Sequence, residues 1–118
     1  MQINLTPAEQ AFVQQYIETA EWVDPPVEGW YLNLSNVVRC PAWEREAIID
    51  CLHFYSKYEV YLGAEEIESA AHDLYLSRNG HGAGFWDNSD LRYPMDYAEK
   101  MQRTAEAMGE HKIQFEEE

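Results

Sequence analysis

The stretch Arg78-Asn79-Gly80-His81-Gly82-Ala83-Gly84-Phe85-Trp86-Asp87 is the feature around which the rest of this chain is organised. Its glycines tolerate backbone angles that strain other residues, so three of them in five positions indicate a sharply turning path or a close backbone approach. The two rings that follow each contribute about 2–3 kcal/mol when they are buried. The sequence therefore predicts a contorted structural loop that is fixed to a core by its last two rings, consisting of Asn79, Gly80, Gly82, Gly84, Phe85 and Trp86.

The first helix is predicted to begin at Thr6-Pro7, where Thr6 can cap the helix, Pro7 suits its first position and Glu9 completes a capping box. Asp24-Pro25-Pro26 ends it because proline cannot donate to the helical ladder. Between these signals, apolar residues recur at helical spacing, at Phe12, Val13, Tyr16, Ile17 and Ala20. We therefore expect a helix over residues 7–22, followed by a turn-rich connection.

Three further helices are predicted on either side of the glycine-rich loop. The start signal Cys40-Pro41 opens a helix over residues 41–61. A third helix covers residues 64–76 and ends at Asn79-Gly80, a pair that favours a left-handed turn. The alternative makes residues 73–77 a strand and Asn79-Gly80 a hairpin turn. A fourth helix covers residues 94–108.

Two short segments carry strand patterns. Residues 30–34 are interpreted as a short strand or an extended segment, with Ser35-Asn36 capping a turn over Val37-Val38. Residues 112–115 alternate like a strand and precede the acidic tail 116–118. With 118 residues and no linker or repeat, the chain is predicted to be a single domain of the mainly α (α+β) class, with about four helices and a short β element.

Acidic residues dominate the charge of the chain. It carries 22 acids and 8 Lys or Arg, a formal net charge of −14, and residues 1–38 contain no Lys or Arg. Such a field repels phosphates and lipid headgroups, so direct binding of nucleic acid or membrane is disfavoured and a basic partner is favoured. No apolar run is long enough to span a bilayer, and Met1-Gln2-Ile3-Asn4 lacks the features of a secretory signal. Cys40 and Cys51 do not form a disulfide framework, which indicates a reducing cytoplasm.

The glycine-rich loop also carries a resemblance. The run Asp73-Leu74-Tyr75-Leu76-Ser77-Arg78-Asn79-Gly80-His81-Gly82-Ala83-Gly84-Phe85-Trp86-Asp87 resembles the signature of a family of small bacteriophage and prophage proteins with no assigned activity. The usual form in that family is Asp-Phe-Trp-Leu-Thr-Arg-Asn-Gly-His-Gly-Ala-Gly-Phe-Trp-Asp. Two other segments are similar to the family, Asp50-Cys51-Leu52-His53-Phe54 and Ala107-Met108-Gly109-Glu110 with Ile113 and Phe115. The chain departs from the family at Leu74-Tyr75, Ser77 and Asn88.

The resemblance implies a phage origin and a location in the host cytoplasm, and it transfers no activity. From the residues themselves, a small enzyme or ligand binder could use Arg78 as an anion clamp, His81 as a proton carrier and Asp87 to orient the ring. The alternative is structural, with Arg78 paired to Asp87 and His81 bonded to a backbone carbonyl. We expect no enzyme activity and no cofactor. A metal held by His72, His81, Asp87 and Asp90 is not expected, because their spacing fits no zinc or calcium pattern. A phosphate cradle is not expected because the Walker lysine is missing.

Aromatic residues exceed what a small core easily hides, among them Trp22, Trp30, Tyr31, Trp43, Tyr55, Tyr58 and Tyr61. Most of them are expected to be core or half-buried, and a minority could form a contact patch. The acids expected to bind a protein partner are Glu18, Glu21, Asp24, Glu28, Glu65, Glu66 and Glu68. The leading hypothesis is a phage accessory protein that binds a basic host protein. By mimicking nucleic-acid charge it would inhibit a defence system (an anti-CRISPR or anti-restriction role) or a DNA-processing system. A third hypothesis is a structural or dimerising phage protein.

Overall fold

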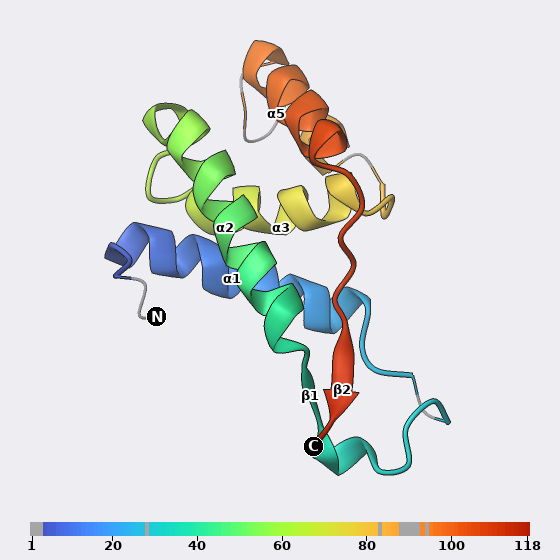
Figure 1. The fold of residues 1–118 in the computed structure, drawn as a ribbon. Helices are drawn as coiled ribbons and strands as arrows, with labels where there is room; N and C mark the ends of the chain where they lie inside the picture. The colour runs from blue at the N-terminus through green and yellow to red at the C-terminus, as the bar shows by residue number, and fades with distance from the viewer. Residues whose placement is uncertain (1–3, 28, 83, 88–92, 94) are drawn as a thin grey trace.

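The structure, a computed structural model, describes residues 4–27, 29–82, 84–87, 93 and 95–118, and for Trp86, Asp87 and Met95 it describes the backbone alone. The elements in chain order are α1 (Pro7–Val23), a 3-10 turn (Leu34–Asn36), β1 (Val37–Arg39), α2 (Pro41–Tyr58), a second 3-10 turn (Glu59–Tyr61), α3 (Ile67–Arg78), the short α4 (Gly84–Asp87), α5 (Met95–Met108) and β2 (Phe115–Glu117) (Figure 1). The predicted fold, mainly helical with a short β element, is confirmed.

Helix α1 begins as its sequence predicts. The Thr6 hydroxyl accepts a hydrogen bond from the Glu9 backbone N–H at 3.1 Å, and the Glu9 carboxylate accepts one from the Thr6 N–H at 2.8 Å. This capping box satisfies two N–H groups that the start of a helix leaves without a partner. The buried face of the helix consists of Phe12, Val13, Tyr16, Thr19 and Ala20. Asp24 closes the helix through its N–H, which donates to the Ala20 carbonyl at 2.9 Å.

The following helices differ from prediction at their ends. Helix α2 stops at Tyr58, because the chain tightens there into the 3-10 turn. Helix α3 starts at Ile67, since the Glu66 N–H donates to the Gly63 carbonyl and makes residues 64–66 a turn. Its far end follows the helical prediction, and the hairpin alternative is wrong. Gly80 takes a left-handed φ of 75°, and the His81 N–H donates back to the Leu76 carbonyl.

The strands are not where the sequence places them. Residues 30–34 form no strand, and Val37-Val38 belong to β1 instead of a turn. The Asn33 side chain caps the 3-10 turn, so the chain becomes extended only at Val37. Strand β1 pairs antiparallel with β2, with Val37 opposite Glu117 and Arg39 opposite Phe115. The predicted strand over residues 112–115 therefore begins only at Phe115 and includes part of the acidic tail.

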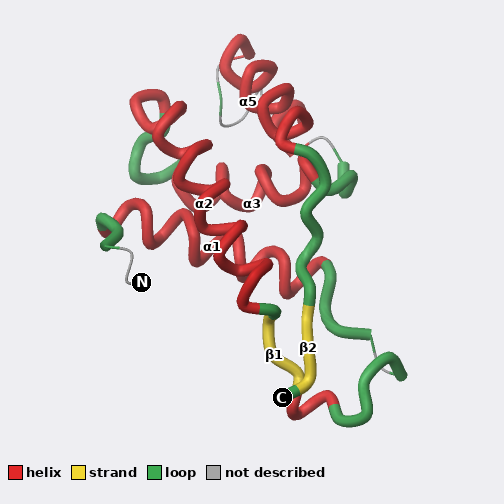
Figure 2. The backbone as a smooth tube through the Cα atoms, in the orientation of Figure 1, coloured by secondary structure: helices red, strands yellow, loops and turns green. Residues whose placement is uncertain are grey.

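Helix α3 packs against α1, α4 and α5, and α1 packs against α2. The core cluster is rich in aromatic rings, among them Phe12, Tyr16, Trp43, Phe54, Tyr75 and Phe85. Residues 109–114, which we call the strap, run from α5 past α2 and α3 to β2 as one loop (Figure 2). The connection over residues 24–36 and the two strands, which we call the arm, extend away from the helices (Figures 1 and 2).

Candidate functional site

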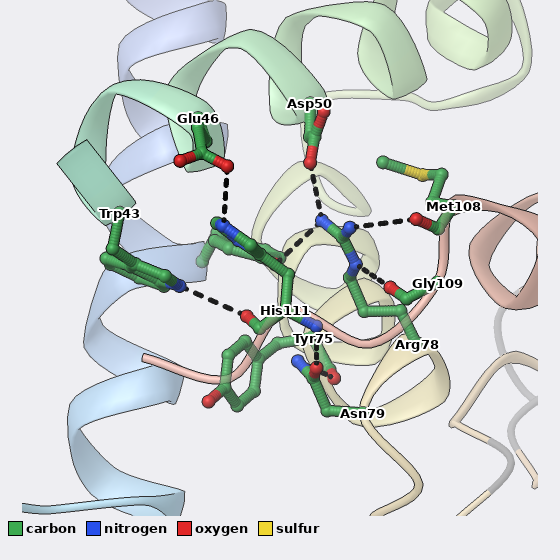
Figure 3. A network of polar contacts seen from close by, with 10 residues as sticks. Trp43, Glu46, Asp50, Tyr75, Arg78, Asn79, Met108, Gly109 and His111 are labelled. Atoms are coloured by element: carbon green, nitrogen blue, oxygen red, sulfur yellow. Dashed lines mark hydrogen bonds and ion pairs between the residues drawn. The ribbon is translucent and has the colours of Figure 1, made fainter. Parts of the chain in front are cut away.

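Arg78, at the last position of α3, is the centre of a buried polar network (Figure 3). Its Nε donates to the Gly109 carbonyl at 2.8 Å, and its Nη2 donates to the Met108 carbonyl at 3.3 Å. Its Nη1 donates to the Asp50 carboxylate at 3.0 Å and to the Tyr16 hydroxyl at 3.3 Å. Four of the five guanidinium N–H groups are thus used, and the side chain is only 3% exposed. Arg78 therefore ties the end of α5 to α1 and α2.

Arg78, Tyr16 and Cys51 are buried together, whereas the Asp50 carboxylate is partly exposed. Burial works to lower the pKa of Arg78, but contact with Tyr16 and Asp50 outweighs burial and raises it. Burial raises the pKa of the neighbouring Tyr16 phenol and of the Cys51 thiol, and Arg78 offsets these shifts only in part. The guanidinium thus stays charged and the two acids stay neutral, so Cys51 is an inert core thiol.

Asn79 holds the strap against the end of α3 (Figure 3). Its side-chain oxygen accepts a hydrogen bond from the His111 N–H at 2.6 Å, and its amide nitrogen donates to the Tyr75 carbonyl at 3.0 Å. On the other side of the strap, the Trp43 Nε1 donates to the His111 carbonyl at 3.1 Å. We call Arg78, Asn79 and the residues that bind their side chains the clasp.

The glycine-rich loop turns directly after the clasp and brings α4 against α3. Gly80 and Gly82 have positive φ angles of 75° and 102°. At Gly84, an added Cβ would lie 3.0 Å from the backbone of Asp73, so only glycine fits this close approach without a shift. Phe85 is fully buried and packs on Phe54 with ring centroids 5.5 Å apart. The side chain of Trp86 lies outside the described residues.

His81 faces α1 and not Arg78. Its Nε2 lies 2.9 Å from Asp24 Oδ2, and the same oxygen accepts a hydrogen bond from the Tyr75 hydroxyl at 2.7 Å. The Tyr75 hydroxyl in turn accepts from the Ile113 N–H at 3.1 Å. Burial raises the pKa of the Tyr75 phenol, which keeps it protonated as a donor. This chain of contacts joins the end of α1, the glycine-rich loop and the strap.

Arg78 and His81, two of the three residues in the predicted set with Asp87, have separate partners. Arg78 is enclosed and directed at Asp50, while His81 is directed at Asp24. The side chain of Asp87 lies outside the described residues, so its expected pairing with Arg78 stays a prediction. Among the residues that the structure describes, no group of three or more His, Cys, Asp or Glu side chains is arranged to hold a metal ion.

The predicted acidic residues lie in two places. Glu18 and Glu21 are exposed on the last two turns of α1. They line a groove of about 480 Å³ between α1 and α2, together with Arg39 and Glu44. Glu65, Glu66 and Glu68 lie instead at the start of α3, and none of them lines this groove. Asp24 is half-buried by its contacts with Tyr75 and His81, and Glu28 is outside the described residues.

Large apolar side chains are exposed on and beside the arm. Trp22, Trp30 and Leu32 are 75%, 76% and 99% exposed, and Val27 and Leu34 are also exposed. Among the described residues, five of the eight large exposed hydrophobic side chains fall between positions 22 and 34, so they form a local feature of the chain. Beside them, a groove of about 470 Å³ lies between residues 24–31 and the strap, with Trp30, Tyr31, Pro25 and Phe115 in its walls.

The aromatic residues predicted as candidates for a contact patch lie partly in the core and partly on the surface. Trp43, Tyr55 and Tyr58 are buried, Tyr31 is half-buried, and the exposed members are Trp22, Trp30 and Tyr61. Val27, Leu32 and Leu34 were not predicted to be exposed. Leu32 and Leu34 belong to the segment interpreted as a strand, and a strand pattern favours burial of alternate side chains. Arg39, whose guanidinium bridges Glu21 and Glu44, was not singled out either.

No family model, curated protein or solved structure matches this chain. The resemblance of residues 73–87 to a phage signature therefore stays a prediction. Within the described residues, no helix is both long and apolar enough to cross a membrane.

Proposed function

We propose that this chain is a phage-encoded accessory protein whose arm binds a host protein with an apolar pocket bordered by basic residues. The observation that carries the proposal is the group of exposed apolar side chains at Trp22, Val27, Trp30, Leu32 and Leu34. Large exposed apolar side chains concentrated in one segment of a small protein indicate an interaction site. Tryptophan is also enriched among the few residues that carry most of the binding free energy at interfaces.

Burial of this surface supplies enough free energy for specific binding. A large apolar side chain contributes about 2–3 kcal/mol when a partner removes it from water. Leu32 is almost wholly exposed in the free chain and Trp30 is about three-quarters exposed, so most of their surface is available for that transfer. The two-stranded sheet and the Tyr31 hydroxyl, which donates to the Phe115 carbonyl at 3.4 Å, hold the base of the arm in place. An anchored arm loses less conformational entropy on binding than a free segment would.

Charge selects the kind of partner. Glu18 and Glu21 lie just before the arm in the chain, and residues 1–38 contain no Lys or Arg. A net charge of −14 opposes contact between two copies of this chain and favours a partner of opposite sign. We therefore prefer a basic host protein to the dimerising alternative.

The acidic residues are not confined to one helix or strand. Acids lie on all four long helices and on β2, among them Glu9, Glu46, Glu68, Glu99 and Glu117. A mimic of duplex DNA needs a dense row of carboxylates, because the duplex carries about one charge per 1.7 Å of its axis. Our proposal therefore assigns recognition to the arm and its neighbouring acids. Inhibition of a defence or DNA-processing system is the outcome proposed for this binding.

The experiment is retention of host proteins from a bacterial lysate on the immobilised chain at about 0.05 M and about 0.5 M salt, with identification by mass spectrometry. We expect a basic protein to be retained at low salt and largely released at high salt. The double variant Trp30→Ser/Leu32→Ser should reduce its retention at least about 30-fold, since a hot-spot residue contributes about 2 kcal/mol or more.

A matched control removes apolar surface elsewhere. Val60→Ser/Tyr61→Ser changes two exposed hydrophobic residues in the 3-10 turn after α2, far from the arm in sequence. This variant should retain the same protein as the unmodified chain. Equal losses in both double variants, or retention that does not depend on salt, would contradict the proposal.

A further inference from the structure

The groove between α1 and α2 is lined by apolar residues and by charged residues that we call its rim, which are Glu18, Glu21, Arg39 and Glu44. The apolar residues are Leu5, Val13, Ile17 and Ile48, of which Val13 is buried. On the α1 side, the groove is lined by Gln10 and by the residues 3, 4, 7, 8 and 11 positions after it. These are Val13, Gln14, Ile17, Glu18 and Glu21. This is the spacing of one helix face. At about 1.5 Å per residue, the eleven steps give a face about 16 Å long, which matches three turns of a second helix.

The charges on the rim are arranged unfavourably for the isolated chain. Glu21 lies in the last turn of α1, where the helix dipole disfavours an acid, and no basic residue is present in that turn. The only compensation shown on this rim comes from Arg39, which lies 3.2 Å from Glu21 and 2.8 Å from Glu44. One arginine thus joins the acids of both walls, and Glu18 bonds only to the neutral Gln14 amide in the described contacts.

We propose that this groove binds a basic amphipathic helix of the partner protein, whose apolar residues cover Ile17 and Ile48 while its Lys or Arg residues pair with Glu18 and Glu21. In helix-in-groove recognition, the bound helix presents apolar anchors at i, i+3, i+4 and i+7 to an apolar groove, and its polar face meets the rim. Arg39 occupies the position that a partner cation would take, and it acts as an internal competitor. A second groove lined by Glu21, Arg39, Val37 and Phe115 continues this surface to the strands of the arm.

This inference rests on the proposed function, because it specifies which part of the basic partner protein binds in the groove between α1 and α2. The test uses a fluorescent peptide of about 14 residues, with leucines at i, i+3, i+4 and i+7 and lysines beside them. A second peptide of the same composition has its leucines scattered around the helix. Fluorescence anisotropy at about 0.05 M salt should show saturable binding of the first peptide and at least about tenfold weaker binding of the second.

Variants of the groove give the decisive comparison. Glu18→Gln/Glu21→Gln should weaken binding of the amphipathic peptide about tenfold. The control Glu65→Gln/Glu68→Gln removes the same charge outside the groove and should change affinity less than about twofold. Ile17→Ser should weaken binding without altering the charge. Arg39→Gln should strengthen binding about two- to fivefold, because it removes the internal competitor.

Several results would overturn the inference. Equal effects of the two Glu→Gln double variants, or equal affinity for both peptides, would mean that the peptide is attracted only by the net charge of the chain. Weaker binding by a folded Arg39→Gln variant would show that Arg39 does not compete for the groove. If circular dichroism shows that Arg39→Gln loses helix content, the comparison of the two Glu→Gln double variants tests the inference instead. The arm variant Trp30→Ser/Leu32→Ser should bind the peptide normally, so failure of this inference is distinguishable from failure of the arm as an anchor.

Discussion

The clasp buries its large polar side chain, whereas the arm exposes its large apolar side chains to water. In the clasp, Arg78 is 3% exposed and directs its donors at a carboxylate, a hydroxyl and two carbonyls. In the arm, Trp30 and Leu32 are mostly in contact with water, although both are costly to leave there. The contacts of the clasp stabilise the fold, whereas the exposed side chains of the arm contribute little to it. We therefore assign the binding function to the arm.

The contacts of the glycine-rich loop support its predicted structural role. Arg78 and Asn79 bind the strap, Gly84 lets α4 approach α3, and Phe85 fills the core. Each of these residues acts on the fold of the chain. We therefore regard the glycine-rich loop as architectural and expect the binding surface of this chain to lie outside it.

The largest expected effect comes from breaking the clasp with Arg78→Met. The variant leaves the Asp50 carboxylate and two strap-side carbonyls without their donor. We expect the free energy of unfolding to fall by about 3 kcal/mol, the lower end of the range for a broken buried pair, because Asp50 remains about one-third exposed. Urea denaturation monitored by circular dichroism measures this change.

Arg103→Ala is the control for the loss of a positive charge. Arg103 is 71% exposed and pairs only with Glu99 one helical turn away in the described contacts. Its removal should change the free energy of unfolding by less than about 0.5 kcal/mol. If the two arginine variants are equally stable, the clasp does not hold the fold together.

A smaller effect is expected from Gly84→Ala. The added Cβ would lie 3.0 Å from the Asp73 backbone, which cannot move as a side-chain tip can, so α4 must shift away from α3. We expect a loss of about 1–3 kcal/mol in the free energy of unfolding, typical of overpacking. At Gly63, the atom that an added Cβ meets is the end of the flexible Glu66 side chain. Gly63→Ala should therefore be nearly neutral, and a Gly84→Ala variant of unchanged stability would refute the close approach.

The sequence predicted the parts of this structure that depend on neighbouring residues. The capping box of α1, the end of α3 at Gly80 and the burial of Phe85 all follow from local chemistry or apolarity. It failed where the partner is distant in the chain. Strand β1 forms because Val37 meets Glu117, eighty positions later, and no local pattern specifies that register.

The site shows the same limit. Arg78 and His81 stood out in the sequence, but their partners, Asp50 and Asp24, could only be identified in three dimensions. Conversely, Trp30 and Leu32 are of residue types that are usually buried, and only the path of the arm exposes them to solvent. Residues 1–38 were recognised as free of basic residues, yet the way Glu18 and Glu21 face a groove depends on how α2 packs on α1.

The most direct test of the account is the stability of the arm variant Trp30→Ser/Leu32→Ser, measured by urea denaturation on the same preparation that is used for host-protein retention. We predict that its free energy of unfolding stays within about 0.5 kcal/mol of the unmodified chain, as for surface substitutions, while retention is lost. A loss of about 2 kcal/mol or more in stability, or retention that survives the change, would show that the arm is part of the structural core and not the binding surface.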